Sequence, residues 1–240
     1  MVTIESGQQA ELEAAGVLLE NASPTEILAW AIERYHPRLT MATAFGPEGC
    51  AIIHMIARIE PSVRVFNLDT GYQFAETLRL RDRIAEELGL VVELVRPIQT
   101  VAEYESANGG PVYNHEPDRC CRDRKLQPMK RAIVGYDAWI SSIRADQSSH
   151  RAKASVVGFD QKFGLVKINP LLRWTQRDVW AYIMTHGVPY NPLHDHGYPS
   201  IGCWPCTRSV QAGETDERAG RWAGQAKTEC GLHSLDSSQL

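Results

Sequence analysis

The chain has 240 residues, of which 43% are hydrophobic and 22% charged, and its formal net charge is −4. These values are typical of a globular protein with one large domain, and the negative charge argues against general binding to nucleic acid. No apolar run reaches the length of a membrane span, and the first residues lack the basic and apolar regions of a secretory signal, so we expect a cytoplasmic protein with no membrane partner.

The hydrophobic pattern predicts helices and strands that alternate along the chain. Two helices are expected between residues 8 and 35, and Ser23 caps the second with Glu26 in a capping box. The last helix should begin after Thr175 and end at Gly187. Further on in this pattern, strands are expected at 39–45, 63–69, 90–96 and 138–144, helices at 50–59, 73–89 and 124–135, and a hairpin at 154–171. This alternation is typical of an α/β fold with a doubly wound, mostly parallel sheet.

After Val188 the sequence becomes rich in Pro, Gly and His, which indicates loops and a tail. We therefore divide the chain into an α/β nucleotide-binding domain at 1–187, including the N-terminal helices, and a C-terminal segment at 188–240. In doubly wound sheets, ligands bind beyond the carboxyl ends of the strands. The C-terminal segment is expected to lie across that edge.

Two strand ends carry residues that could surround a phosphate. The first strand runs into "TAFGPEG" and the second into "NLDTG". A strand that leads through a glycine turn into a helix presents backbone N–H groups to an anion, although neither turn is a Walker loop or a dinucleotide fingerprint. Between Arg119 and Arg177 the basic residues also outnumber the acidic ones. This excess suggests a local anionic ligand, and a solvated basic face is the alternative.

Cysteines form two close pairs. Cys120 and Cys121 are adjacent, and Cys203 and Cys206 form a C-x-x-C pair. Four thiolates suit a zinc ion or a four-iron cluster, and adjacent cysteines strain a tetrahedral zinc site, so iron–sulfur is favoured. The alternatives are a buried thiol pair beside an unrelated C-x-x-C and a thioredoxin-like redox motif. Cys50 opens an apolar helix and is interpreted as a core residue.

Cys230 has no such partner. It stands in "TECGLH" near the end of the chain, in a polar stretch where a cysteine buries little. The charges of Arg218, Arg221 and Lys227 would favour its thiolate. It is either an incidental surface cysteine or a reactive thiol.

Together, "NLDTG", "CCRDRK", "IGCWPCTR", "GRW" and "ECGLH" resemble the adenylyl-sulfate (APS) reductase family, in its iron–sulfur branch, from about Thr40 to His233. The resemblance implies a nucleotide alpha hydrolase-like fold of the PP-loop type and the thioredoxin-dependent reduction of APS to sulfite and AMP, for cysteine biosynthesis. It implies that Cys230 is the nucleophile and carries an S-sulfocysteine intermediate. It also implies one [4Fe-4S] cluster per chain, held by Cys120, Cys121, Cys203 and Cys206.

The same resemblance suggests which residues bind the substrate. The residues implied for the phosphosulfate group are Lys125, Arg144, Arg218 and Arg221. Those implied for the adenosine are Gly46, Glu48, Leu68 and Asp69. The chain departs from the family where Ala44 and "FGPEG" follow the first strand, and where Asp118 and Arg119 precede the tandem cysteines.

Other functions remain as alternatives. A reductase for the 3′-phosphorylated substrate, PAPS, also carries the terminal cysteine but lacks the four paired cysteines. A PP-loop adenylating enzyme should carry S-G-G-x-D-S after the first strand, which this chain does not. A zinc-stabilised binding module would have no use for Cys230. The oligomeric state and a role for His233 beside Cys230 stay open.

Overall fold

The computed structural model describes residues 6–225, 227 and 229–232. Its centre is a six-stranded sheet in the order β3-β2-β1-β4-β6-β5. All neighbouring strands are parallel except β5, which runs antiparallel to β6. The strands are β1 (Leu39–Thr43), β2 (Arg64–Leu68), β3 (Val92–Val95), β4 (Ala138–Ile140), β5 (Val157–Asp160) and β6 (Leu165–Ile168).

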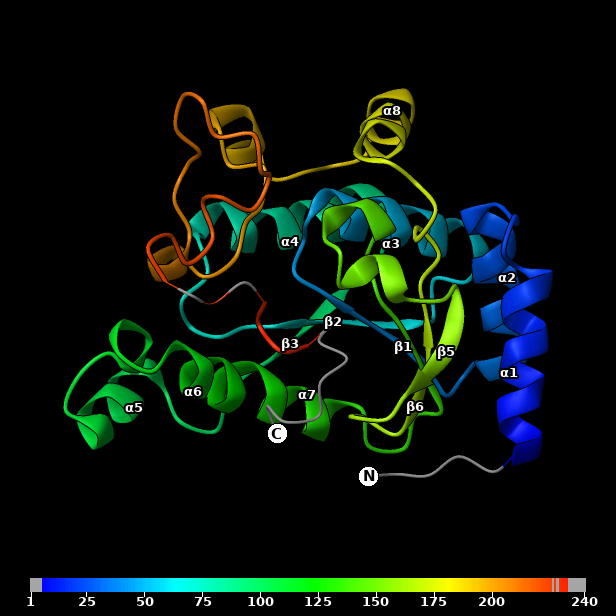
Figure 1. Ribbon diagram of the computed structural model, residues 1–240, viewed down its shortest axis with the longest axis horizontal. Coiled ribbons are helices and arrows are strands. Elements are labelled where there is room, and N and C mark those ends of the chain that lie inside the picture. Colours follow the sequence, from blue (N-terminus) through cyan, green and yellow to red (C-terminus); the bar gives the residue numbers. More distant parts are fainter. Residues whose placement is uncertain (1–5, 226, 228, 233–240) are drawn as a thin grey trace.

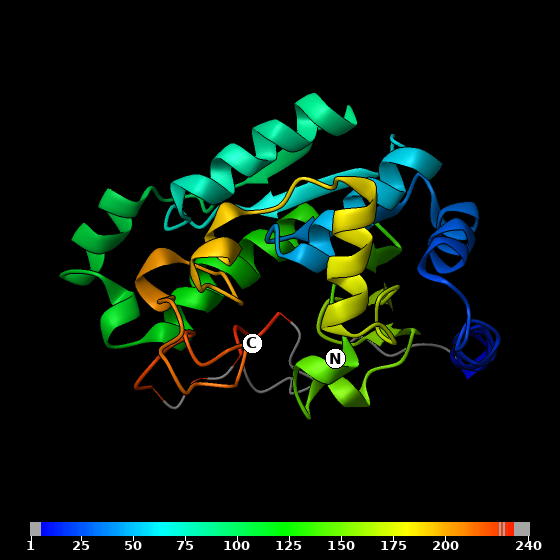
Figure 2. The same cartoon turned by 90° about the horizontal axis from the view of Figure 1, so that it is seen from above.

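Helices cover both faces of the sheet. In the views of Figures 1 and 2, α3, α4 and α8 lie on one side of the sheet, α6 and α7 lie on the other, and α1 flanks the edge strand β5. The doubly wound, mostly parallel α/β fold is therefore confirmed. The helices are α1 (Ser6–Leu18), α2 (Pro24–Tyr35), α3 (Pro47–Ile59), α4 (Ala75–Leu88), α5 (Val101–Asn108), α6 (Pro117–Cys121), α7 (Gln127–Ala132) and α8 (Gln176–His186).

The core has three apolar clusters, and the two that include strand residues explain why the strands read as continuous hydrophobic runs. The largest cluster includes the strand residues Met41 and Ile140 and the α3 residues Ile52 and Ile53, all of them fully buried. The second cluster lies around Trp139. Because both faces of the sheet are covered, the strands are held in place and their ends form a fixed edge.

Local sequence signals set most of the helix ends. Ser23 and Glu26 form the predicted capping box of α2, and Thr175 and Asp178 form that of α8. Helix α3 begins at Pro47, earlier than predicted. The helix expected at 124–135 is the end of a longer helical stretch, in which α6, with the tandem cysteines, continues through a π-helical turn at Arg122–Leu126 into α7. The short helix α5 was not predicted.

The strand register places two strand ends side by side. Thr43 at the end of β1 pairs with Asn67, one residue before the end of β2. The C-terminal segment meets this region of the fold, because Gln73 and Cys203 form an isolated β-bridge and the Trp204 N–H donates to the Tyr72 carbonyl at 2.8 Å. None of the helices in the described residues is long and apolar enough to cross a membrane.

The capping box of α8 gives a test of the fold. The Thr175 hydroxyl accepts from the Asp178 N–H and donates to the Asp178 carboxylate at 2.7 Å. We expect Thr175→Ala to lower the free energy of unfolding by about 1 kcal/mol, because the first turn loses this cap. Thr185→Ala, at an exposed position of the same helix, is the control and should change it by less than about 0.5 kcal/mol. Equal effects in urea unfolding would contradict the capping role.

Candidate active site

A cavity of about 180 Å³ opens where β1 and β2 end. It is lined by the ends of these strands, the start of α3, the stretch after β4 and the C-terminal segment. Segments far apart in the sequence therefore meet at the edge of the sheet where α/β folds bind ligands. The predicted site residues that line the cavity are Gly46, Glu48, Leu68, Lys125, Arg218, Arg221 and Cys230.

The turn between β1 and α3 presents a helix N-terminus to this cavity. Gly46 is the N-cap of α3 and offers no side-chain hydrogen bond to the first turn. Before it, Phe45 has a positive φ of 57° and donates its N–H to the Thr43 hydroxyl at 3.0 Å. Gly49 lies so close to Thr43 that a β-carbon there would come within 2.7 Å of the hydroxyl oxygen. The free backbone N–H groups and the helix dipole suit an anion.

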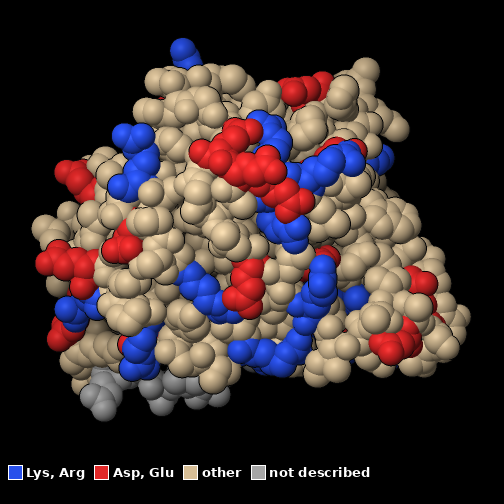
Figure 3. Space-filling model, turned by 180° about the vertical axis from the view of Figure 1, so that it is seen from behind, with Lys and Arg blue, Asp and Glu red and all other residues tan. Residues whose placement is uncertain are grey.

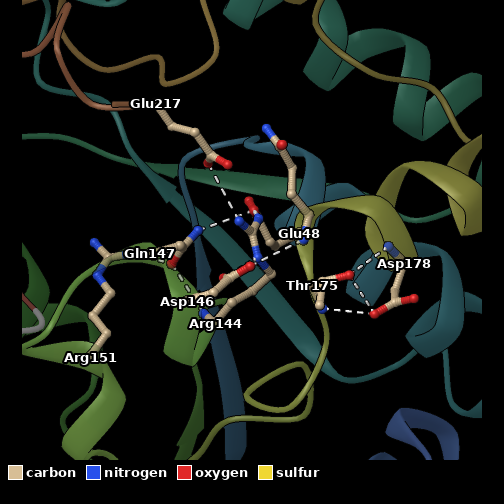
Figure 4. Close-up of polar contacts among 9 residues, drawn as sticks. Glu48, Arg144, Asp146, Gln147, Arg151, Thr175, Asp178 and Glu217 are labelled. Atoms are coloured by element: carbon tan, nitrogen blue, oxygen red, sulfur yellow. Dashed lines mark hydrogen bonds and ion pairs between the residues drawn. The ribbon is translucent and has the colours of Figure 1, made fainter. Parts of the chain in front are cut away.

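Glu48 and Arg144 form a buried ion pair beneath the cavity. Arg144 is 1% exposed, and its guanidinium contacts Glu48, Asp146 at 2.8 Å and Glu217 at 3.4 Å (Figure 4). Burial raises the pKa of Glu48, and Arg144 opposes that shift. Arg144 itself does not line the cavity. Through its ion pair, Arg144 holds the Glu48 side chain in place. A direct contact of Arg144 with the phosphosulfate group stays a prediction.

Asp69 is buried and does not line the cavity. Its carboxylate accepts from the Gly71 N–H at 3.0 Å and pairs with Arg96 at 2.9 Å, and it is 7% exposed. The preceding residue, Leu68, does line the cavity. Asp69 therefore fixes the turn that follows β2, and the prediction that it borders the adenosine is untested.

Cys230 lies among cations. The cavity also contains Lys125, which approaches from the π-helical turn, and Arg221 from the C-terminal segment. Burial alone would raise the pKa of the Cys230 thiol, but Lys125, a backbone N–H and Arg221 together bring it below its ordinary value. A cysteine in such surroundings favours the thiolate, which is the nucleophilic form.

Ion pairs hold the chain around Cys230. The Glu229 carboxylate accepts from Arg151 through two N–O contacts of 3.1 Å and from Arg218 at 3.3 Å. Lys162 donates to the Gly231 carbonyl on the other side. Arg151 lines the cavity but was not predicted, although it lies within the basic stretch of Arg119–Arg177. Other polar or charged residues that line the cavity and were not predicted include Gln147, His194, Glu217 and Glu229.

The four paired cysteines line a second, smaller cavity next to the first. Cys120 and Cys121 come from α6, and Cys203 and Cys206 come from the C-terminal segment. Burial raises the pKa of Cys120 to about 12, and Cys121, Cys203 and Cys206 add to the shift, so the four sulfurs share one environment. Within the described residues, no group of three or more His, Cys, Asp or Glu side chains is arranged to hold a metal ion as it stands. The donor set nevertheless fits a thiolate-bound metal or cluster.

Lys125 and Trp222 line both cavities, so the two cavities share a wall. His233 lies outside the described residues. On the face shown in Figure 3, Lys and Arg side chains lie interspersed with Asp and Glu side chains.

Comparisons with known proteins place the geometry in context. A model of the phosphoadenosine phosphosulfate reductase domain matches residues 38–209. The adenosine 5′-phosphosulfate reductase of Streptomyces coelicolor is 45% identical over 225 residues, which cover 94% of each chain. The phosphoadenosine 5′-phosphosulfate reductase of Gloeobacter violaceus is 44% identical over 229 residues, or 94% of this chain and 95% of that protein.

Solved structures agree with the fold. The phosphoadenylyl-sulfate (PAPS) reductase of Candida auris, solved as a phosphate complex, matches with a TM-score of 0.75 and 30% identity, over 87% of this chain and 99% of that one. The FMN adenylyltransferase of Candida glabrata matches with a TM-score of 0.57 and 13% identity, over 95% of this chain and 79% of that one. This second likeness concerns the fold alone.

His194 gives a pH test of the cavity wall. Its ring lies 5.5 Å from that of Trp180, and burial lowers its pKa from 6.5 to about 4. Below pH 6.5 the unfolded chain therefore binds a proton that the folded chain binds only near pH 4, and the free energy of unfolding falls as the pH drops through this window. This one group contributes up to about 1.4 kcal/mol per pH unit.

Urea unfolding of His194→Gln at pH 7, 6 and 5 should therefore show a shallower fall than the unsubstituted chain. His196→Gln, at an exposed position of the same turn, is the matched control and should keep the original slope. If the His194 variant also kept that slope, burial of a neutral imidazole at this position would be contradicted.

Proposed function

The chain belongs to the phosphoadenosine phosphosulfate reductase domain family, and we propose that it reduces adenosine 5′-phosphosulfate to sulfite and AMP with thioredoxin as the reductant. The observation that carries this proposal is the placement of the Cys230 thiol beside Lys125 and Arg221, in a cavity that also receives the N-terminus of α3. A thiolate, cations and a helix N-terminus together suit attack on an anionic sulfur centre.

In the first step the Cys230 thiolate attacks the sulfur of the sulfate group. A sulfur–sulfur bond forms, the bond from that sulfur to the phosphate oxygen breaks, and AMP leaves with the electron pair. The product on the enzyme is an S-sulfocysteine. Because nucleophile and substrate are both negative, the cations Lys125, Arg218 and Arg221 would offset their repulsion.

In the second step one thiolate of reduced thioredoxin attacks the Cys230 sulfur. The new bond is a mixed disulfide, and sulfite leaves with the electrons of the broken sulfur–sulfur bond. The second thiol of thioredoxin then attacks the mixed disulfide, which restores Cys230 and leaves thioredoxin oxidised. The dithiol thus supplies both electrons. Since Cys230 must meet a second protein, we propose that the part of the C-terminal segment that carries Cys230 opens and closes over the cavity, while Cys203 and Cys206 stay in place.

We propose that Cys120, Cys121, Cys203 and Cys206 hold one [4Fe-4S] cluster per chain. This assignment is supported by their position around a single small cavity, which shares the lining residue Lys125 with the active-site cavity. When bound, the cluster would supply negative charge and a rigid link between α6 and the C-terminal segment. Lys125 would then lie between the cluster and the nucleophile and orient the substrate anion.

The choice between APS and PAPS depends on the cysteines. Close relatives carry either name, as in the proteins of Streptomyces coelicolor and Gloeobacter violaceus. We favour APS because the chain carries both cysteine pairs. PAPS is the second candidate, and parallel assays with both nucleotides decide between them. The dependence on thioredoxin and the reduced state of the thiols are consistent with a place in the cytoplasm.

Substitution of the nucleophile tests the proposed function. We expect Cys230→Ser to release sulfite from APS and thioredoxin at less than about a thousandth of the original rate, because the hydroxyl cannot form the intermediate. Binding of AMP should remain. Cys50→Ala, which removes a fully buried thiol in α3, is the control and should retain turnover. Sulfite release from the serine variant at the original rate would refute this role of Cys230.

Purified protein tests the metal assignment. We expect anaerobically prepared protein to be brown and to contain about four iron and four sulfide per chain, because the paired cysteines are all available as ligands. Cys203→Ser should lose most of the visible absorbance, while Cys50→Ala should keep it. Colourless protein with stoichiometric zinc would contradict the cluster.

A further inference from the structure

Glu229, the residue before Cys230, lines the cavity. It meets Arg151 in a two-pronged ion pair with both contacts at 3.1 Å, and Arg218 at 3.3 Å. The side chains of Arg151 and Glu229 are only 9% and 14% exposed. An ion pair of this bidentate form is both stronger and more directional than a surface pair.

We propose that Glu229 is a positioning residue that latches the Cys230 segment into the cavity through Arg151. The role in turnover rests on the proposed function, whereas the latch itself is a property of the chain without substrate. Consecutive α-carbons lie about 3.8 Å apart, so the Cys230 sulfur can move only a short distance from the cavity while the Glu229 carboxylate stays bound to Arg151. The latch therefore holds Cys230 near the cations that favour its thiolate.

The charges of the cavity explain why this carboxylate is available as a latch. Among the lining residues described, the other carboxylates are Glu48 and Glu217, and both pair with Arg144 outside the cavity. Glu229 instead pairs with arginines of the cavity wall. It occupies the forked face of Arg151 and leaves Lys125 and Arg221 facing Cys230.

A second contact holds the other side of the segment. Lys162, in the turn between β5 and β6, donates to the Gly231 carbonyl. Cys230 is thus held on one side by a side-chain ion pair and on the other by a backbone contact. Both must break before the cysteine can reach another protein, and Glu229→Gln weakens the ion pair while the contact of Lys162 remains.

The test compares the reactivity of Cys230 toward a small and a bulky thiol reagent. Full-length chain without substrate is treated with iodoacetamide or with a polyethylene-glycol maleimide, and mass spectrometry quantifies modification of the Cys230 peptide. In Glu229→Gln the ratio of bulky to small reagent rates should rise about tenfold, as expected for the loss of an ion-paired hydrogen bond. If Glu229→Gln acted only by removing a negative charge near the thiol, the rates with both reagents would rise together and their ratio would stay unchanged.

Two further variants sharpen the result. Glu214→Gln breaks another two-pronged pair in the same segment, with Arg208 at 2.7 and 2.8 Å, outside the cavity. It should leave both ratio and turnover unchanged. Glu229→Asp keeps the charge, and its ratio of bulky to small reagent rates should lie between those of the original chain and Glu229→Gln. This variant also keeps the test valid if Glu229→Gln fails to fold.

Turnover gives the second readout. In Glu229→Gln we expect kcat for sulfite release to fall about tenfold with KM changed less than about twofold, because the nucleophile rather than the substrate is displaced. An unchanged reagent ratio in Glu229→Gln and Glu229→Asp would overturn the latch. A raised ratio in a chain that releases no sulfite from either nucleotide would support the latch while refuting the proposed function.

Discussion

The site depends on positive charge gathered at the carboxyl edge of a parallel sheet. Lys125 comes from the helix that carries the tandem cysteines, and Arg218 and Arg221 come from the C-terminal segment. The charges of Lys125 and Arg221 oppose the effect of burial on the pKa of Cys230 and favour its thiolate. The same cations would meet the negative charge of a phosphosulfate group. One electrostatic arrangement would thus serve both Cys230, as the proposed nucleophile, and the anionic group that it attacks.

The fold makes this arrangement by bringing distant segments together. The neighbouring ends of β1 and β2 and the N-terminus of α3 form the floor, and Arg144 supports it from below through Glu48. The C-terminal segment lines the same cavity and is tied to residues much earlier in the chain by ion pairs, such as Glu229 with Arg151. A rigid sheet edge is therefore combined with a C-terminal segment that ion pairs hold against it.

The sequence predicted the sheet and the caps of α2 and α8, because these depend on local patterns. The two cysteine pairs, which line one cavity, were grouped by residue type although they lie far apart in the chain. The sequence also led to Lys125, Arg218 and Cys230, which line the cavity at the sheet edge. It did not reveal that Arg144 and Asp69 engage neighbouring charged residues, since residue types do not state their partners. Arg151 was missed because its partner Glu229 lies 78 residues away, a distance that no local pattern spans. The helix α5 was missed although Thr100 and Glu103 form a capping box.

Mass spectrometry of the chain mixed with APS and no reductant tests the central claim most directly. Transfer of the sulfonate to Cys230 should add one SO₃ group, about 80 Da, to the peptide that carries this cysteine, and a dithiol added afterwards should remove it as sulfite. The account predicts this adduct in the original chain and its absence from Cys230→Ser. Sulfite formed during turnover without any adduct on Cys230 would contradict it.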